Sequence, residues 1–113
     1  MLTIKELKDG DIVILQVAGK MLDTDARALS EKVKDLVAAG IRKIILDLGG
    51  INLMNSCFGL GIIVSCWGNM NRASGKLVIA NPSPKVIRLL DITKLNQVFS
   101  IYKSIDEAKL KLY

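Results

Sequence analysis

Side chains that could be modified or could bind a partner lie close together in the segment from Asn52 to Gly61, NLMNSCFGLG. Ser56 carries the only hydroxyl of this segment, and a hydroxyl can hydrogen-bond to a partner or accept a phosphoryl group. Cys57 follows it with a thiol, which would be redox-sensitive if a helix N-terminus lowered its pKa, whereas a lone cysteine beside apolar neighbours is usually inert. The segment is therefore a candidate site for contact with another chain or for chemical modification.

The sequence lacks the residue patterns of the common enzyme classes. It contains no histidine, which removes the commonest general base, the usual triad partner and a favoured metal ligand. Cys57 and Cys66 lie nine residues apart, a spacing that matches neither a zinc site nor a redox pair. No glycine-rich segment ends in Gly-Lys-Ser/Thr, so the Walker type of nucleotide-binding loop is missing. We therefore expect no enzymatic activity, no catalytic residue, no bound metal and no cofactor.

The size and composition of the chain fit one small globular domain. With 113 residues, 50% of them hydrophobic and 24% charged, the chain can bury a core without disulfides and is expected to form a single domain over residues 1–113. Its two cysteines are expected to be reduced and mostly buried, which suits a reducing compartment. We expect a monomer or a weak dimer.

Charge and hydropathy argue against nucleic-acid and membrane partners. The formal net charge is +5, but the lysines are spread along the chain and aromatic residues make up only 4%, so no basic, base-stacking surface is expected. The longest nearly apolar run, Phe58 to Trp67, is about half of the roughly 20 residues that a membrane span requires. Met1 leads directly into a mixed segment without a secretory signal. The predicted location is the cytoplasm.

Strand-like and helix-like segments alternate along the chain, which predicts an α/β layered domain. The turn Asp9-Gly10-Asp11 lies between two strand-like runs and predicts a β-hairpin. A loop over Gly19 to Asp23 precedes a helix that Asp23 or Thr24 would cap. Gly40 has the position of a left-handed residue after that helix. The elements expected in this half are a strand 2–7, a strand 12–17, a helix with Leu29, Val33, Leu36 and Val37 facing inward, and a buried central strand 41–48.

The second half begins with a loop over Gly49 to Cys57, which leads into a second helix. Its dipeptide Ser74-Gly75 is a helix-ending signal. Ser83 before Pro84 predicts the start of a third helix, and a capping box at 104–107 predicts a fourth. Short strands are expected at 76–80 and 98–102. The predicted inward positions are Phe58, Ile62, Cys66, Trp67 and Met70 in the second helix and Val86, Ile87 and Leu90 in the third.

The segment from Asn52 to Gly61 joins the central strand to the second helix, so unpaired backbone N–H groups at the start of that helix point outward. The small residues Ser56, Gly59 and Gly61 permit close approach by another chain, and the helix dipole favours a phosphate or an acidic side chain there. A purely structural role is the alternative. In that case Asn55 or Ser56 only caps the helix, and the glycines only allow tight packing.

One stretch, IILDLGGINLMNSCFGLGIIV, resembles the signature of STAS domains, the family of bacterial anti-sigma factor antagonists. The family pattern is a hydrophobic strand ending in Asp-Leu, followed by a loop with Asp-Ser-Ser/Thr-Gly-Leu-Gly that starts a helix. The stretch VAGKMLDTDARAL is similar to the family's Gly-x-Leu-Asp loop and first helix, with Gly19, Leu22 and Asp23 matching. The stretch GKLVIANPSPKVIRLLDITKLNQVFSIYKSIDEA resembles its later strand and helices, so the resemblance covers nearly the whole chain.

This resemblance implies a STAS-like mixed β-sheet of about 4–5 strands packed with about 4 α-helices. It also implies a transcription regulator of the partner-switching kind, which binds an anti-sigma factor, commonly a serine-protein kinase, and so releases a sigma factor. The kinase phosphorylates a serine or threonine of the signature loop, which weakens binding, and a PP2C-type phosphatase reverses the modification. Carried onto this chain, the partner-binding residues are Asp23, Asn55, Ser56, Cys57, Phe58, Gly59 and Gly61.

Two departures from the family pattern affect the predicted modification site. Asn55 stands where the family commonly has an aspartate, which removes a charge but keeps the capping capacity. The loop is also one residue longer, so the usual phosphoacceptor falls on Cys57 when aligned from the left and on Phe58 when aligned from Gly59. We therefore predict that Ser56 is the phosphoacceptor. The alternative is that Ser56 only caps the helix and the chain is never phosphorylated.

Three further alternatives stay open on the sequence alone. Phe58 would be an exposed contact for the partner or part of the core. Asp23 would contact the partner or cap the first helix. The whole chain would be an antagonist regulated by phosphorylation, or an unphosphorylated STAS scaffold that senses a ligand such as a nucleotide or a lipid.

Overall fold

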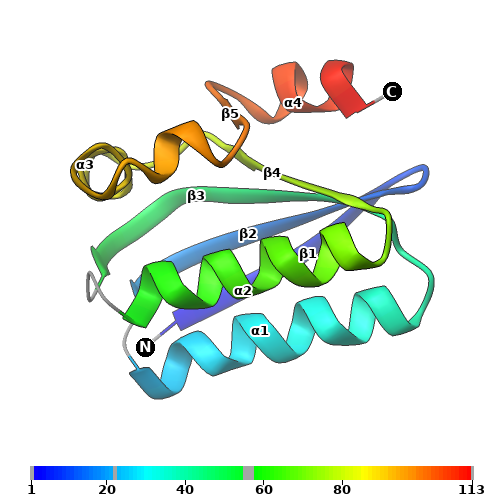
Figure 1. Ribbon diagram of the computed structural model, residues 1–113, viewed down its shortest axis with the longest axis horizontal. Coiled ribbons are helices and arrows are strands. Elements are labelled where there is room, and N and C mark those ends of the chain that lie inside the picture. The colour runs from blue at the N-terminus through cyan, green and yellow to red at the C-terminus, as the bar shows by residue number, and fades with distance from the viewer. Residues whose placement is uncertain (1, 22, 55–57, 113) are drawn as a thin grey trace.

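The described part of the chain forms a five-stranded mixed sheet with helices on both faces (Figure 1). The computed structural model describes the backbone of residues 2–21, 23–54 and 58–112, and the side chains of residues 2–20, 27–51 and 61–112. The strand order is β1-β2-β3-β4-β5; β1 pairs antiparallel with β2, and the other three pairs are parallel. The elements are β1 (Leu2–Asp9), β2 (Ile12–Met21), α1 (Asp23–Ala38), β3 (Lys43–Met54), α2 (Phe58–Arg72), β4 (Lys76–Ala80), α3 (Pro84–Thr93), the 3-10 helix η1 (Leu95–Gln97), β5 (Ile101–Tyr102) and α4 (Ile105–Leu112).

Successive side chains of a strand point to opposite faces of the sheet, and both faces are covered here, so the strands contribute to two cores. The larger core lies between the sheet and the helices α1 and α2 and includes Leu46 and Ile63, both with no exposed surface. The smaller core lies between the sheet and α4 and includes Ile45 and Ala108. Residues 44–48 of β3 are all buried, as expected for a central strand covered on both sides.

The predicted hairpin, helices and short strands are all present, and the α/β fold class is confirmed. Gly40 follows α1 with a φ of +92°, the left-handed conformation expected at this position. At the start of α3, the backbone N–H of Val86 donates to Ser83 Oγ at 3.4 Å. At the start of α4, the backbone N–H of Glu107 donates to Ser104 Oγ at 3.2 Å. The capping signals therefore located these helix starts correctly.

Two of the predicted loops are wrong in extent, because both segments are strand. Residues 19–21 continue β2 and residues 49–54 continue β3, and the two extensions pair up to Met21 opposite Met54. Register shifts between Gln16 and Ala18 and between Gly19 and Lys20 allow the pairing to continue. The buried side chain of Ile51 joins the larger core, which stabilises the extension of β3. Only residues 55–57 therefore separate β3 from α2.

One predicted core position is also wrong. Ile87 is 45% exposed, whereas Val86 and Leu90 of the same helix are buried. Neighbouring residues of a helix point about 100° apart, so the narrow buried stripe of α3 includes Val86 and leaves Ile87 at its edge. The strand predicted over 98–102 is shorter than expected, because only Ile101–Tyr102 pair with β4.

Candidate functional site

The carboxyl ends of the parallel strands lie at one edge of the sheet, and the helices begin there. Because β2, β3 and β4 are parallel neighbours, the helices that follow them, α1, α2 and α3, all start at this edge (Figure 1). The first backbone N–H groups of a helix have no partner inside the helix, and the helix dipole adds partial positive charge. This edge is therefore suited to accept a partner's carbonyl groups or an anionic group.

The sequence-predicted site residues fall on this edge wherever the structure describes them. Asp23 is the first residue of α1, Phe58 is the first residue of α2, and Gly59 lies in the first turn of α2. The side chains of Asp23 and Phe58 are outside the described part, so their capping, partner-binding and packing roles stay predictions. Also outside the described residues lie Asn55, Ser56 and Cys57.

α2 presents small residues to solvent at Gly61 and Ser65. Gly61 is exposed, and a Cβ added there would meet nothing within 4 Å. Ser65, one turn further along, is also exposed. Ile63 and Cys66 lie on the opposite side of the helix and are fully buried. The backbone of α2 is therefore open to close approach by another chain on the face that carries Gly61.

The buried carboxylate of Asp47 links the middle of β2 and β3 to the residue that follows β4. Asp47 is 8% exposed, and its Oδ1 accepts hydrogen bonds from the backbone N–H of Gly49 at 3.0 Å and from Asn81 Nδ2 at 3.2 Å. Its Oδ2 accepts from Gln16 Nε2 at 3.3 Å. The Asp47 network, meaning Gln16, Asp47, Gly49 and Asn81, thus links β2 and β3 to the residue that follows β4. It fixes the segment of β3 that leads to the start of α2.

Asn81, a member of the Asp47 network, fills the space beside Gly49 and leaves no room for a side chain at that position. A Cβ built on Gly49 would lie 2.3 Å from Asn81 Nδ2 and 2.9 Å from the Asn81 backbone oxygen. Asn81 itself has a φ of +49°, a left-handed conformation that asparagine tolerates better than most residues. The glycine therefore allows Asn81 to approach β3 and donate to Asp47.

Sequence reasoning missed the Asp47 network, although a signal for it exists. Asp47 is the only charged residue in the otherwise apolar run from Ile44 to Leu48, and Gln16 similarly interrupts the run from Ile12 to Val17. A polar residue within a buried strand requires a hydrogen-bonding partner. The two interruptions could have been read as a pair, because the strands that contain them are parallel neighbours.

The thiol of Cys66 is fully buried in the larger core. It has no exposed surface, and burial raises the pKa of its thiol to about 12, with the nearby Lys34 ammonium offsetting only part of this effect. The thiolate is the nucleophilic form, so the thiol is unreactive near neutral pH. The expectation of a free, buried cysteine is thus confirmed for Cys66.

We predict that Cys66 reacts with a water-soluble thiol reagent only when the protein unfolds. In a Cys57→Ser background at pH 8, labelling followed by absorbance should be slow in buffer and immediate in denaturant. The raised pKa also means that the folded state holds the proton between the ordinary value of 9.0 and about 12, while the unfolded state loses it. Between those pH values, the free energy of unfolding should therefore fall more steeply in wild type than in Cys66→Ala. Rapid labelling of the folded protein would contradict the prediction.

Among the residues that the structure describes there is neither a metal site nor a membrane-spanning helix. No three His, Cys, Asp or Glu side chains in this part of the chain are placed to hold a metal ion. No helix formed by these residues has both the length and the apolar character needed to cross a bilayer.

The chain is similar in sequence and in fold to proteins of one known family. The model of the STAS domain matches residues 4–108. The chain is 31% identical over 93 residues to the anti-sigma-B factor antagonist of Bacillus subtilis, covering 82% of this chain and 83% of that protein. A crystal structure of a Thermotoga maritima protein has a TM-score of 0.89 at 27% identity, covering 96% and 93% of the two chains. The phosphorylated form of the Bacillus cell fate determinant SpoIIAA has a TM-score of 0.77 at 15% identity, covering 98% and 100%.

These matches extend over nearly all of the elements described above. The matched residues 4–108 run from β1 into α4 and include the edge at which α1 and α2 begin. The chain therefore belongs to the STAS domain family, to which its relatives among the anti-sigma factor antagonists also belong.

Proposed function

We propose that this chain is a cytoplasmic anti-sigma factor antagonist that binds an anti-sigma factor of the serine-protein kinase type and catalyses nothing itself. The family and the name of its Bacillus subtilis relative support the general function. The observation that carries the proposal for this chain is the open face of α2, where Gly61 is exposed and a Cβ added to it would meet nothing within 4 Å. A partner can dock there against backbone and small side chains.

The proposed binding edge combines shape with electrostatics. The starts of α1 and α2 lie at the same edge, so a partner that contacts one can also contact the other (Figure 1). The first backbone N–H groups of a helix have no partner within the helix, so these two starts favour carbonyl or carboxylate groups of the partner. The Asp47 network holds the middle of β3 in place, before the extension of the strand that leads to α2. We infer that Asp23, residues 55–59 and Gly61 form the contact surface.

Reversible phosphorylation of Ser56 is the proposed regulation, with a PP2C-type phosphatase removing the phosphate. A phosphoryl group adds about −1.5 to −2 charges at pH 7. At the N-terminus of α2 this charge is compatible with the fold, because the dipole and the free N–H groups favour it. The phosphorylated form of SpoIIAA keeps the same fold, with a TM-score of 0.77 to this chain, which supports a switch that changes the surface and leaves the fold intact.

Mass spectrometry tests the modification site. The purified chain is incubated with ATP and the anti-sigma kinases encoded in the same genome, and the modified peptide is identified. We expect one phosphoryl group on wild type and none on Ser56→Ala. Ser65→Ala is the matched control, because Ser65 is an exposed hydroxyl on the same helix and its loss should leave the modification unchanged. Phosphorylation of Ser56→Ala would reject this site.

Substitution of Gly61 separates partner binding from folding. Gly61→Ala should raise the free energy of unfolding by about 0.5–1 kcal/mol, because alanine is the better helix former and its Cβ meets nothing within 4 Å. The same Cβ should weaken partner binding by about tenfold, because it keeps the two backbones apart. Gly68→Ala lies two turns away with ordinary contacts and serves as the control. Denaturant unfolding and calorimetric titration measure the two effects, and unchanged binding by Gly61→Ala would contradict close approach at this face.

A further inference from the structure

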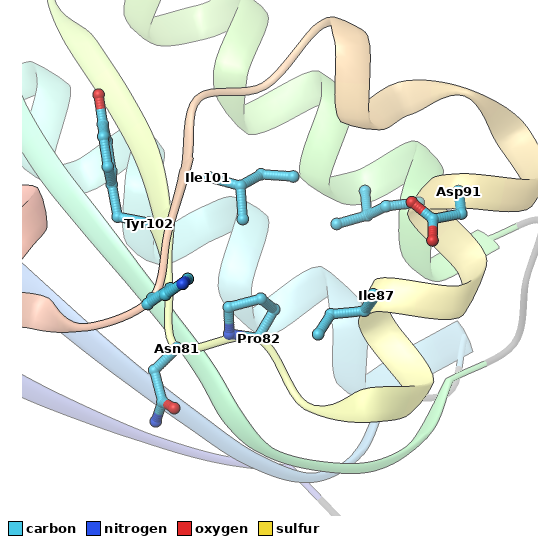
Figure 2. A pocket seen from close by; sticks show the side chains of 8 residues that line it. Asn81, Pro82, Ile87, Asp91, Ile101 and Tyr102 are labelled. Carbon is cyan, nitrogen blue, oxygen red and sulfur yellow. The ribbon is translucent and has the colours of Figure 1, made fainter.

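An apolar pocket lies between α3 and β5, away from the face of α2 that carries Gly61. Its volume is about 370 Å³, and its walls include Pro82, Ile87, Leu90 and Ile101. Figure 2 shows Ile101 pointing from β5 toward α3, and Ile87 pointing from α3 toward Pro82. The volume is within the range of pockets that hold small molecules, which are typically apolar with a few polar groups at fixed positions.

The polar residues of this pocket lie at its two ends. Asn81 and Tyr102 are on the strand side and Asp91 is on the opposite side, on α3 (Figure 2). Lys103 follows Tyr102 in the chain and also lines the pocket. The Asp91 carboxylate already accepts a hydrogen bond from Asn96 Nδ2 at 2.9 Å. The ion pairs among the residues that the structure describes are Lys32–Glu6, Lys43–Asp11 and Lys109–Asp9, so Lys103 has no carboxylate partner within this set.

The strand side of the pocket is preformed, because hydrogen bonds within the protein hold its residues in place. The backbone N–H of Asn81 donates to the backbone carbonyl oxygen of Tyr102 at 2.9 Å, and Asn81 Nδ2 donates to Asp47 Oδ1 at 3.2 Å. The pairing of β5 with β4 fixes the backbone of Ile101 and Tyr102, and so places Lys103, the next residue, beside the pocket. Leu90 is 1% exposed, so the opposite wall is anchored in the core. A preformed wall lowers the conformational entropy that the protein loses when a ligand binds.

We propose that this pocket binds a monocarboxylate with an aliphatic body. The aliphatic chain packs against Ile87, Leu90 and Ile101, and the carboxylate pairs with the Lys103 ammonium. The carboxylate lies at the strand end, because the Asp91 carboxylate at the other end repels it. A ligand with several phosphates is a poorer match, since the walls are mainly apolar and a single cation lines them. The site does not depend on the proposed antagonist function.

Titration with octanoate, 1-octanol and octylamine tests this site, with the backbone amide resonances of the full chain followed by nuclear magnetic resonance. Octanoate should shift the amides of Ile87, Leu90 and Ile101 and bind more tightly than either analogue. Lys103→Gln should weaken octanoate by about three- to tenfold and leave 1-octanol unchanged. Asp91→Asn should tighten octanoate by about twofold, since a like charge is removed. Lys85→Gln, an exposed lysine of α3 outside the pocket, is the control.

A second variant distinguishes loss of the pocket from loss of the fold. Ile87 is 45% exposed, so Ile87→Asp should fold normally, yet it places a carboxylate in the pocket and should abolish octanoate binding. The proposal is overturned if octanoate and octylamine bind equally, if Lys103→Gln binds octanoate as wild type does, or if the shifts fall elsewhere. It is also overturned if the same amides shift on concentrating the protein alone and octanoate adds nothing, because a second copy then occupies the pocket.

Discussion

Replacing Asp47 by alanine is expected to lower the free energy of unfolding by about 2–3 kcal/mol. The Asp47 carboxylate accepts hydrogen bonds from the backbone N–H of Gly49, from Asn81 Nδ2 and from Gln16 Nε2, and alanine leaves these three donors without their acceptor. Because Asp47 is 8% exposed, water replaces the carboxylate poorly. Chemical denaturation measures the change, with the midpoint and the slope compared between variants.

A milder substitution at the same position separates the acceptor from the charge. Asp47→Asn keeps one oxygen for Gly49 and Asn81, and Gln16 can turn its amide to accept from the new NH₂ group. This variant should therefore lose only about 1 kcal/mol. Asp35→Ala removes an exposed carboxylate from α1 and is the control, with an expected change within about 0.5 kcal/mol. A result for Asp47→Ala equal to that for Asp35→Ala would show that the network contributes little.

The second large effect is expected on partner binding. Ser56→Asp should weaken binding to the anti-sigma factor by about a hundredfold, because a fixed negative charge must be desolvated in the contact with the partner. Ser56→Ala should bind within about threefold of wild type, since it removes only a small neutral hydroxyl. Both variants should unfold at nearly the same denaturant concentration as wild type, because an acidic group is compatible with a helix N-terminus.

Asn71→Asp provides the control for added charge alone. Asn71 is exposed near the last residue of α2, so aspartate there adds the same charge at the opposite end of the helix from residues 55–57. Its effect on the dissociation constant should be several times smaller than that of Ser56→Asp. Tight binding by Ser56→Asp in calorimetric titration would argue against a switch based on charge.

The elements of this fold could be predicted from local signals in the sequence. The Asp-Gly-Asp turn at 9–11 joins two apolar strands, and Ser83 before Pro84 starts α3 with the hydrogen bond expected of a cap. These features depend on neighbouring residues only. The ends of β2 and β3 were predicted too early, because both extensions depend on pairing with a strand distant in sequence and on two register shifts. Ile87 was misplaced because the width of the buried stripe on α3 depends on what packs against it.

The location of the candidate site in the fold could also be predicted in part. Parallel strands with crossover helices imply that α1 and α2 start at one edge, and the structure places Asp23 and Phe58 at those starts. The Asp47 network was not predicted, because two of its three hydrogen bonds join residues 31 and 34 positions apart. The pocket between α3 and β5 was not predicted for the same reason. Ile87 and Lys103 line one pocket because β5 pairs with β4, a contact between residues distant in the sequence.

The most direct test of the proposed function is a calorimetric titration of the chain with its anti-sigma factor, before and after treatment with the kinase and ATP. An antagonist of this family should bind the anti-sigma factor while Ser56 is unmodified and lose most of that affinity once Ser56 is phosphorylated. Treatment with a PP2C-type phosphatase should restore binding. A chain that binds none of the anti-sigma factors of its own cell in either state, while remaining folded, would contradict the proposal.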